Sequence, residues 1–266
     1  MKPAAAARAA GVGVERRLRP GGGGRSAEPA VPAAAPAAAA AATGPARPTR
    51  ATRSAIDGRP AAAGAGARQP ATAALLAQVR ACTQCAAQLP HGPRPVLQFD
   101  ARARILLAAQ APGRKVHASG VPFDDASGER LRAWLGLTRA AFYDPRLLAI
   151  VPMGLCYPGK GASGDLPPRR ECAPRWRAPL LGRLRQLQLT LVVGQYALAY
   201  HLPAERSGLT VAVRGWRRHW PQVVPLPHPS PRNNGWLRAN PWFERELLPR
   251  LRERVAQIVA DRAPRT

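Results

Sequence analysis

Acidic residues and cysteines are scarce in this sequence, and long apolar runs are missing from it. The 266 residues include 15 Asp and Glu against 40 Lys and Arg, which gives a formal net charge of +25. This excess favours a polyanionic partner such as nucleic acid. The four cysteines are too few for a disulfide-stapled secreted miniprotein. No run approaches the roughly 20 apolar residues of a membrane-spanning helix, so we expect no membrane span.

Large apolar side chains are nearly missing from residues 1–70, which consist mainly of Ala, Gly, Pro and Arg. Such a segment cannot bury enough surface to offset an ordering entropy of roughly 1–2 kcal/mol per residue. We therefore predict a disordered basic arm over 1–70 and one folded domain over 71–266. We expect a monomer in the bacterial cytosol or nucleoid, although an Arg-rich, acid-poor arm also leaves organellar targeting open.

Short apolar runs alternate with amphipathic segments after residue 70. Buried parallel strands are predicted by the runs at 104–109, 147–151, 189–193 and 222–226. Helices are predicted over 74–82, 127–136, 177–188 and 241–262. This order indicates an α/β fold of three layers, α/β/α, with a central, mainly parallel four-stranded sheet. Ligands bind beyond the carboxyl ends of such strands, which nominates the loops 109–128 and 227–234.

The four cysteines have the spacing of a metal site. Cys82 and Cys85 form a CxxC pair, and Cys156 and Cys172 follow at a distance. Four thiolates can bind zinc or an iron–sulfur cluster, and the spacing does not distinguish the two. Unrelated buried thiols or a redox CxxC pair are the alternatives. The segment 157–171 has no apolar run, so we expect a loop tethered at both ends.

These elements together resemble the iron–sulfur family 4 uracil-DNA glycosylases, with features of family 5. The resemblance covers roughly residues 72–260 and is carried by the cysteines, AQAPG (109–113) and HPSPRN (228–233). It implies a [4Fe-4S] cluster held by Cys82, Cys85, Cys156 and Cys172, with zinc as the alternative. The implied role of the cluster is to support a DNA-contacting loop.

The first nominated loop offers groups for holding and hydrolysing a base that has been extruded from DNA. The resemblance implies that Phe123 stacks on the base and that Gln110 lies against its edge. Phe123 can equally be a core residue. Asp125 suits the N-cap of the helix that follows. Because FDDASG is also similar to a family 5 segment, Asp125 is our candidate for orienting water or stabilising positive charge on the sugar.

The second nominated loop contains His228, for which the resemblance implies a hydrogen bond to a carbonyl of the departing base. Ser230 would bind a backbone phosphate. Arg232 occupies the position from which the superfamily wedges a side chain into the vacated stack. For both His228 and Arg232, a purely structural or surface role is the alternative.

Two positions depart from the family pattern. Pro152 stands where family 4 has an Asn that reads the uracil edge, and Gln110 replaces an acidic residue. Selectivity that depends on paired hydrogen bonds is lost when one partner is missing. Asn233 and Gln110 are candidates for supplying the missing amide.

Three segments interleave Arg with Trp, and we expect them to contribute to one DNA-binding face. They are 167–177, 216–220 and 232–242. The prediction is a DNA glycosylase for a deaminated base, uracil first among them, acting in base excision repair. The alternatives are a non-catalytic iron–sulfur nucleic-acid-binding protein that retains the glycosylase fold, and a zinc-bound nucleic-acid protein of other ancestry.

Overall fold

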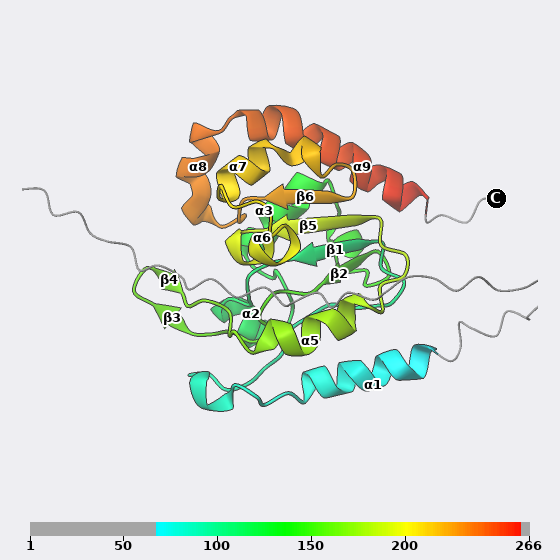
Figure 1. Ribbon diagram of the computed structural model, residues 1–266, viewed down its shortest axis with the longest axis vertical. Helices are drawn as coiled ribbons and strands as arrows, with labels where there is room; N and C mark the ends of the chain where they lie inside the picture. Colours follow the sequence, from blue (N-terminus) through cyan, green and yellow to red (C-terminus); the bar gives the residue numbers. More distant parts are fainter. Residues whose placement is uncertain (1–67, 262–266) are drawn as a thin grey trace, which may run out of the picture. The chain divides into compact units, whose positions relative to one another are not determined.

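A computed structural model describes residues 68–261, and a four-stranded parallel sheet lies at their centre (Figure 1). The spatial order of the strands is β2-β1-β5-β6, and every neighbouring pair is parallel. The strands are β1 (Ile105–Ala108), β2 (Leu148–Ile150), β5 (Leu189–Val193) and β6 (Val223–Leu226). All four coincide with predicted strands to within two residues, and the predicted three-layer α/β/α class is confirmed.

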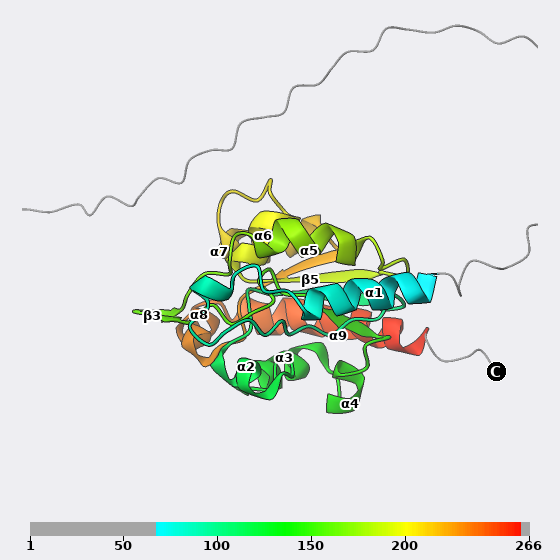
Figure 2. The ribbon, with the colours of Figure 1, turned by 90° about the horizontal axis from the view of Figure 1, so that it is seen from below.

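Both faces of the sheet are covered by helices, which is why its strands are apolar at consecutive positions. On one face, Ile105 and Leu107 of β1 pack with α3 and α9. On the other face, Leu106 packs with α1 and α5, and Ala108 packs with α6 and α7. Figure 2 shows the two helical layers on either side of β5. The covering helices are α1 (Arg68–Arg80), α3 (Ala126–Leu135), α5 (Cys172–Leu181), α6 (Gln195–His201), α7 (Leu209–Arg214) and α9 (Leu248–Ala260).

The remaining elements are short and lie mainly in the connections. They are η1 (Ala86–Gln88), α2 (Arg114–Ser119), α4 (Arg139–Phe142), β3 (Lys160–Gly161), β4 (Gly164–Asp165), η2 (Trp216–Arg218), η3 (Pro231–Asn233), α8 (Asn234–Ala239) and η4 (Phe243–Leu247). The sequence pattern did not predict these short helices, because one or two turns carry too little periodicity.

Four segments differ from their predictions. The helix predicted over 74–82 spans Arg68–Arg80, so it begins six residues earlier and ends two residues earlier. The helix predicted over 177–188 begins earlier, at Cys172, and ends at Gly182, a residue that favours helix termination. The helix predicted over 241–262 is divided into a π-helical turn, η4, and α9. The loop predicted over 157–171 contains the β3–β4 hairpin. The predicted arm, residues 1–70, lies outside the described residues except for its last three, which begin α1.

Arg177 of α5 is a buried cation beneath the end of β2. Its side chain is 2% exposed, and Nη1 donates to the carbonyls of Val151 (2.8 Å) and Pro152 (3.4 Å). Nη2 contacts Nε2 of His201 on α6. Burial lowers the pKa of Arg177 to about 10 and, together with the nearby guanidinium, lowers the pKa of His201 to about 4.

The His201 contact predicts a specific loss of stability in acid. Between pH 6.5 and about 4 the unfolded chain protonates His201 but the folded chain does not, so stability falls as the pH falls. We expect protonation of His201 to lower the free energy of unfolding by about 1–2 kcal/mol over that range. This is less than the full pKa shift would give, because the imidazole keeps some solvent contact. His201→Gln retains an acceptor for Arg177 but does not titrate. As the pH is lowered from 6.5 to about 4, the melting temperature of this variant should therefore decline less than that of the wild type. Parallel profiles of melting temperature against pH for the two proteins would contradict the prediction.

In the range 68–261, no helix combines the length and apolarity needed to cross a membrane.

Candidate active site and cysteine cluster

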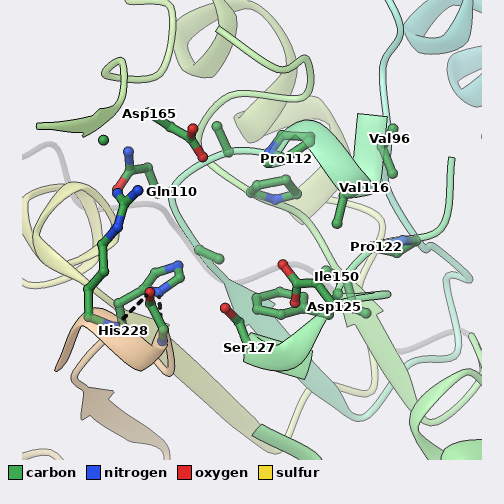
Figure 3. A pocket seen from close by; sticks show the side chains of 18 of the residues that line it. Val96, Gln110, Pro112, Val116, Pro122, Asp125, Ser127, Ile150, Asp165 and His228 are labelled. Atoms are coloured by element: carbon green, nitrogen blue, oxygen red, sulfur yellow. Dashed lines mark hydrogen bonds between the residues drawn. The ribbon is translucent and has the colours of Figure 1, made fainter. Parts of the chain in front are cut away.

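A pocket of about 440 Å³ lies beyond the carboxyl ends of the strands and brings together both nominated loops (Figure 3). All seven residues proposed for catalysis or substrate binding line it. They are Gln110, Phe123, Asp125, His228, Ser230, Arg232 and Asn233. Pro152, Asp165 and Ser127 also line it. Residues separated by more than 100 positions in the chain therefore share one cavity.

The pocket has a buried end and an open mouth. Ile150 and Pro152 at the end of β2 are buried, as is Ser127 at the start of α3. Asp165 on the β3–β4 hairpin and Arg232 on the opposite loop are exposed. The gradient from apolar interior to charged mouth suits a partly apolar, planar ligand that enters from the mouth.

Phe123 lies in a backbone conformation that non-glycine residues seldom adopt. Its φ is +57°, and Tyr143 Oη donates to its carbonyl at 3.2 Å. The loop also folds tightly onto α3, because a Cβ at Gly128 would overlap the Phe123 carbonyl. The half-buried ring lines the pocket and also packs against the core. The stacking and core interpretations therefore do not exclude each other, and strain of this kind accumulates at functional sites.

Asp125 is the N-cap of α3, as its sequence context predicts. One carboxylate oxygen, Oδ1, accepts the Gly128 backbone N–H at 2.9 Å. The carboxylate also lines the pocket and acts electrostatically on His228. Capping engages one oxygen and leaves Oδ2 for other partners, so this geometry accommodates both proposed roles.

His228 lies directly after β6 and is held in one orientation. Its Nδ1 accepts the Ser230 backbone N–H at 3.2 Å, which places the proton of the neutral ring on Nε2. Burial lowers the pKa of His228, while the carboxylates of Asp125 and Asp165 oppose that shift. At pH 7 the residue is therefore a neutral imidazole with one N–H to donate.

The rest of the HPSP loop, residues 227–234, is ordered by its own polar groups. Ser230 Oγ caps η3 by accepting the Arg232 N–H at 3.3 Å, and the Ser230 carbonyl accepts from Arg130 at 3.1 Å. Asn233 Nδ2 donates to the His228 carbonyl at 2.7 Å. The Asn233 amide nitrogen therefore holds the loop, which makes Asn233 the weaker of the two candidates for reading a base.

Gln110 and Pro152 face the same cavity from the ends of β1 and β2. Gln110 Nε2 makes a long contact of 3.5 Å with the Leu166 carbonyl, so its amide is only loosely held. Pro152 brings no polar side chain to the inner wall. The amide that the family resemblance implies at this wall is thus replaced by an apolar ring.

Asp165 is a pocket residue that its sequence context does not predict. It belongs to the β3–β4 hairpin, whose register pairs Lys160 with Asp165 and Gly161 with Gly164. In Figure 3 its carboxylate points into the pocket from the hairpin side. The linear sequence shows only an acidic residue in a Gly-rich stretch, and nothing local predicts that the hairpin folds over the pocket.

The four cysteines line a second, small cavity between the start of α5 and the segment after α1. Two backbone or ring N–H groups donate to their sulfurs at 3.3 Å, from Leu155 to Cys172 and from Trp176 to Cys82. Burial raises the pKa of Cys156 and of Cys172 to about 11, and it outweighs the backbone N–H groups that lower the pKa of each thiol.

These thiols fit a four-thiolate group in donor chemistry, and all four line one cavity. Their convergence in one cavity, with N–H groups directed at two sulfurs, is the environment that thiolate ligands require. Within residues 68–261, however, no three or more His, Cys, Asp or Glu side chains are arranged to hold a single metal ion. The cluster assignment therefore stays a prediction.

The three Arg- and Trp-rich segments do not share one location. Segment 216–220 precedes β6, whereas the HPSP loop follows it, so the two lie at opposite ends of that strand. Trp216 and Trp176 are buried core residues, 3% and 7% exposed. The segment 167–177 lines part of the cysteine cavity, and of the three segments only 232–242 contributes lining residues to the pocket.

The comparison with protein families agrees with this geometry. A model described as the uracil DNA glycosylase superfamily matches residues 97–252, which include both pocket loops and two of the four cysteines.

Proposed function

Because the chain belongs to the uracil-DNA glycosylase superfamily, we propose that it is a DNA glycosylase that excises a deaminated base, uracil first among them, in base excision repair. The family supports glycosylase chemistry on DNA in general. The observation that carries the proposal further is that seven residues from two distant loops line one pocket beyond the strand ends.

The pocket suits a base that has been flipped out of the helix. A base within the duplex stack cannot be reached, so it must be extruded into a cavity of this kind. Phe123 offers an aromatic face at the side of the cavity, and buried Ile150 and Pro152 form an apolar inner wall. Stacking and desolvation there hold the base, while its sugar stays at the mouth.

Hydrolysis breaks the bond between C1′ and the base nitrogen and forms a bond from water to C1′. The bonding electron pair leaves with the base, and the Nε2–H of neutral His228 stabilises the negative charge that develops on a base carbonyl. The free oxygen of Asp125 stabilises positive charge on the sugar. The products are an abasic site and the free base.

The HPSP loop would contact the DNA backbone. Arg232 is exposed and Ser230 half-buried on the side of the pocket where phosphates flanking an extruded nucleotide would pass. A guanidinium at Arg232 is also long enough to occupy part of the space that the base leaves.

Base release from DNA tests this proposal. Labelled single- and double-stranded DNA carrying uracil, hypoxanthine or xanthine is incubated with the full chain and cleaved at abasic sites with alkali. We expect strand cleavage with at least one of these bases and none with undamaged DNA. Measurable DNA binding without abasic product from any base would refute the proposal.

One observation favours the alternative of a non-catalytic nucleic-acid-binding protein that retains the fold. Pro152 presents an apolar ring where the family resemblance implies an amide that reads the base. The retention of Asp125, His228 and Ser230 in the same pocket favours the enzyme. The base-release assay separates the two.

We also propose that Cys82, Cys85, Cys156 and Cys172 hold a [4Fe-4S] cluster, which would tether the segment 157–171 and the β3–β4 hairpin within it. Anaerobically purified protein should be brown and contain about four iron and four sulfide per chain. Cys156→Ser should lose most of that iron, while Ser163→Ala, at a hairpin residue that binds no metal, should retain it. Colourless protein with stoichiometric zinc would contradict the cluster.

A further inference from the structure

The pocket contains a second carboxylate besides Asp125, that of Asp165. We propose that Asp165 is a catalytic residue that accepts a proton from the hydrolytic water. This inference rests on the proposed glycosylase function and names the residue that activates the water molecule in that reaction.

The location of Asp165 matches the place where water must attack. A base held at the buried end of the pocket leaves its sugar at the mouth, and Asp165 is an exposed residue of that mouth. Its Oδ2 lies beside Gly113 of the AQAPG loop, because a Cβ at that glycine would lie 3.4 Å from this oxygen. The carboxylate therefore lies against the loop that follows β1, and both line the pocket.

Buried aromatic contacts hold the other carboxylate oxygen. Tyr157 Oη donates to Asp165 Oδ1 across 3.4 Å, and the Tyr157 ring is 1% exposed and stacks on His91 with centroids 5.3 Å apart. Burial and the nearby carboxylate raise the pKa of Tyr157, so the phenol stays a neutral donor. Tyr157 is thus a positioning residue that leaves Oδ2 directed at the mouth.

The hairpin is also fixed on its other side. The Leu166 N–H donates to the Gly159 carbonyl at 2.9 Å, and Lys160 pairs in register with Asp165. The guanidinium of Arg232 reaches across from the HPSP loop to Gly164, where a Cβ would overlap it. Arg232 therefore lies against the hairpin at the residue before Asp165, and both side chains line the pocket.

The two carboxylates of the pocket are equipped for different tasks. Asp125 uses one oxygen to cap α3, whereas Asp165 belongs to no helix cap and is open to solvent. Both line the pocket and lie close enough to His228 to oppose the lowering of its pKa. In the proposed step the water oxygen bonds to C1′ as the C1′–N bond breaks, one water proton passes to Asp165, and the electron pair leaves with the base.

Single-turnover base release and DNA affinity test the assignment together. Asp165→Asn keeps the size of the side chain but cannot accept the proton, so we expect the rate to fall about 100-fold. DNA binding should be unchanged or tighter, because a negative charge next to phosphates is removed. Added formate should raise the rate of Asp165→Ala at least tenfold, because it replaces the missing carboxylate. Asp124→Asn, which removes a carboxylate that pairs with Arg139 and does not line the pocket, should retain the wild-type rate.

The outcomes separate this inference from the proposed function. If the wild type releases a base and Asp165→Asn retains more than about one third of the rate, Asp165 is not catalytic and the glycosylase function stands. If rate and DNA affinity fall together and formate restores neither, Asp165 has a structural role only, which also overturns the inference. If the wild type releases no base from any substrate, the proposed function itself fails.

Discussion

Asp125→Asn should lower the rate of base release by about 10²–10³-fold while leaving stability nearly unchanged. Asn caps helices as well as Asp does, so the hydrogen bond to the Gly128 N–H is retained. The negative charge that would stabilise the sugar cation is lost. Single-turnover kinetics and thermal unfolding of the same preparation measure the two effects.

Two further variants control for the capping role of Asp125. Asp125→Ala loses both the cap and the charge, so it should show the same loss of rate plus a destabilisation of about 1 kcal/mol. Asp124→Asn, at the adjacent residue that pairs with Arg139 at 3.0 Å, should be active. If Asp125→Asn keeps wild-type activity and only Asp125→Ala is impaired, Asp125 is a helix cap without a catalytic part.

Pro152→Asn should increase the preference for uracil over hypoxanthine about 10- to 100-fold. The proline ring lines the inner wall of the pocket, where an amide could both donate to a base carbonyl and accept from a base N–H. A hydrogen bond made to one base and not to another is a large source of discrimination. The backbone should tolerate the change, because Arg177 holds the carbonyls of residues 151 and 152 and the substitution keeps both carbonyls.

Pro152→Ala is the matched control, because it removes the ring and restores the backbone N–H without adding an amide. We expect it to leave the ratio of kcat/KM values for the two bases within about threefold of the wild type. An equal change in Pro152→Ala and Pro152→Asn would show that the pocket shape, and not the amide, determines selectivity. An unchanged ratio in both would contradict a base-reading position at residue 152.

Much of the fold could be predicted because its strands are short, apolar and buried on both faces. The run LTLVV at 189–193 is predicted and observed with the same bounds. The helix α3 ends at Gly136 with φ +66°, as the glycine there indicates. By contrast, α5 begins five residues before its predicted start, because its first turn carries Cys172 and Pro174 and has little apolar periodicity.

Those site residues could be predicted that belong to a loop directly after a predicted strand. Asp125 and His228 belong to such loops, and the general rule for parallel sheets places those loops at one edge. Asp165 was not predictable in this way, since its place depends on how the hairpin folds back across the pocket. The Arg- and Trp-rich segment 216–220 was misplaced because β6 separates it from the HPSP loop.

Local pattern was therefore sufficient for the strands, the helix cap at Asp125 and the two loops, because these depend on neighbours within a few residues. Two features depend on contacts between distant parts of the chain. They are the second carboxylate at the mouth and the buried Arg177 that supports the end of β2. Such contacts form only when the sheet brings its strand ends together, so the scarcity of acidic residues in the sequence could not reveal that two of the few carboxylates share one pocket.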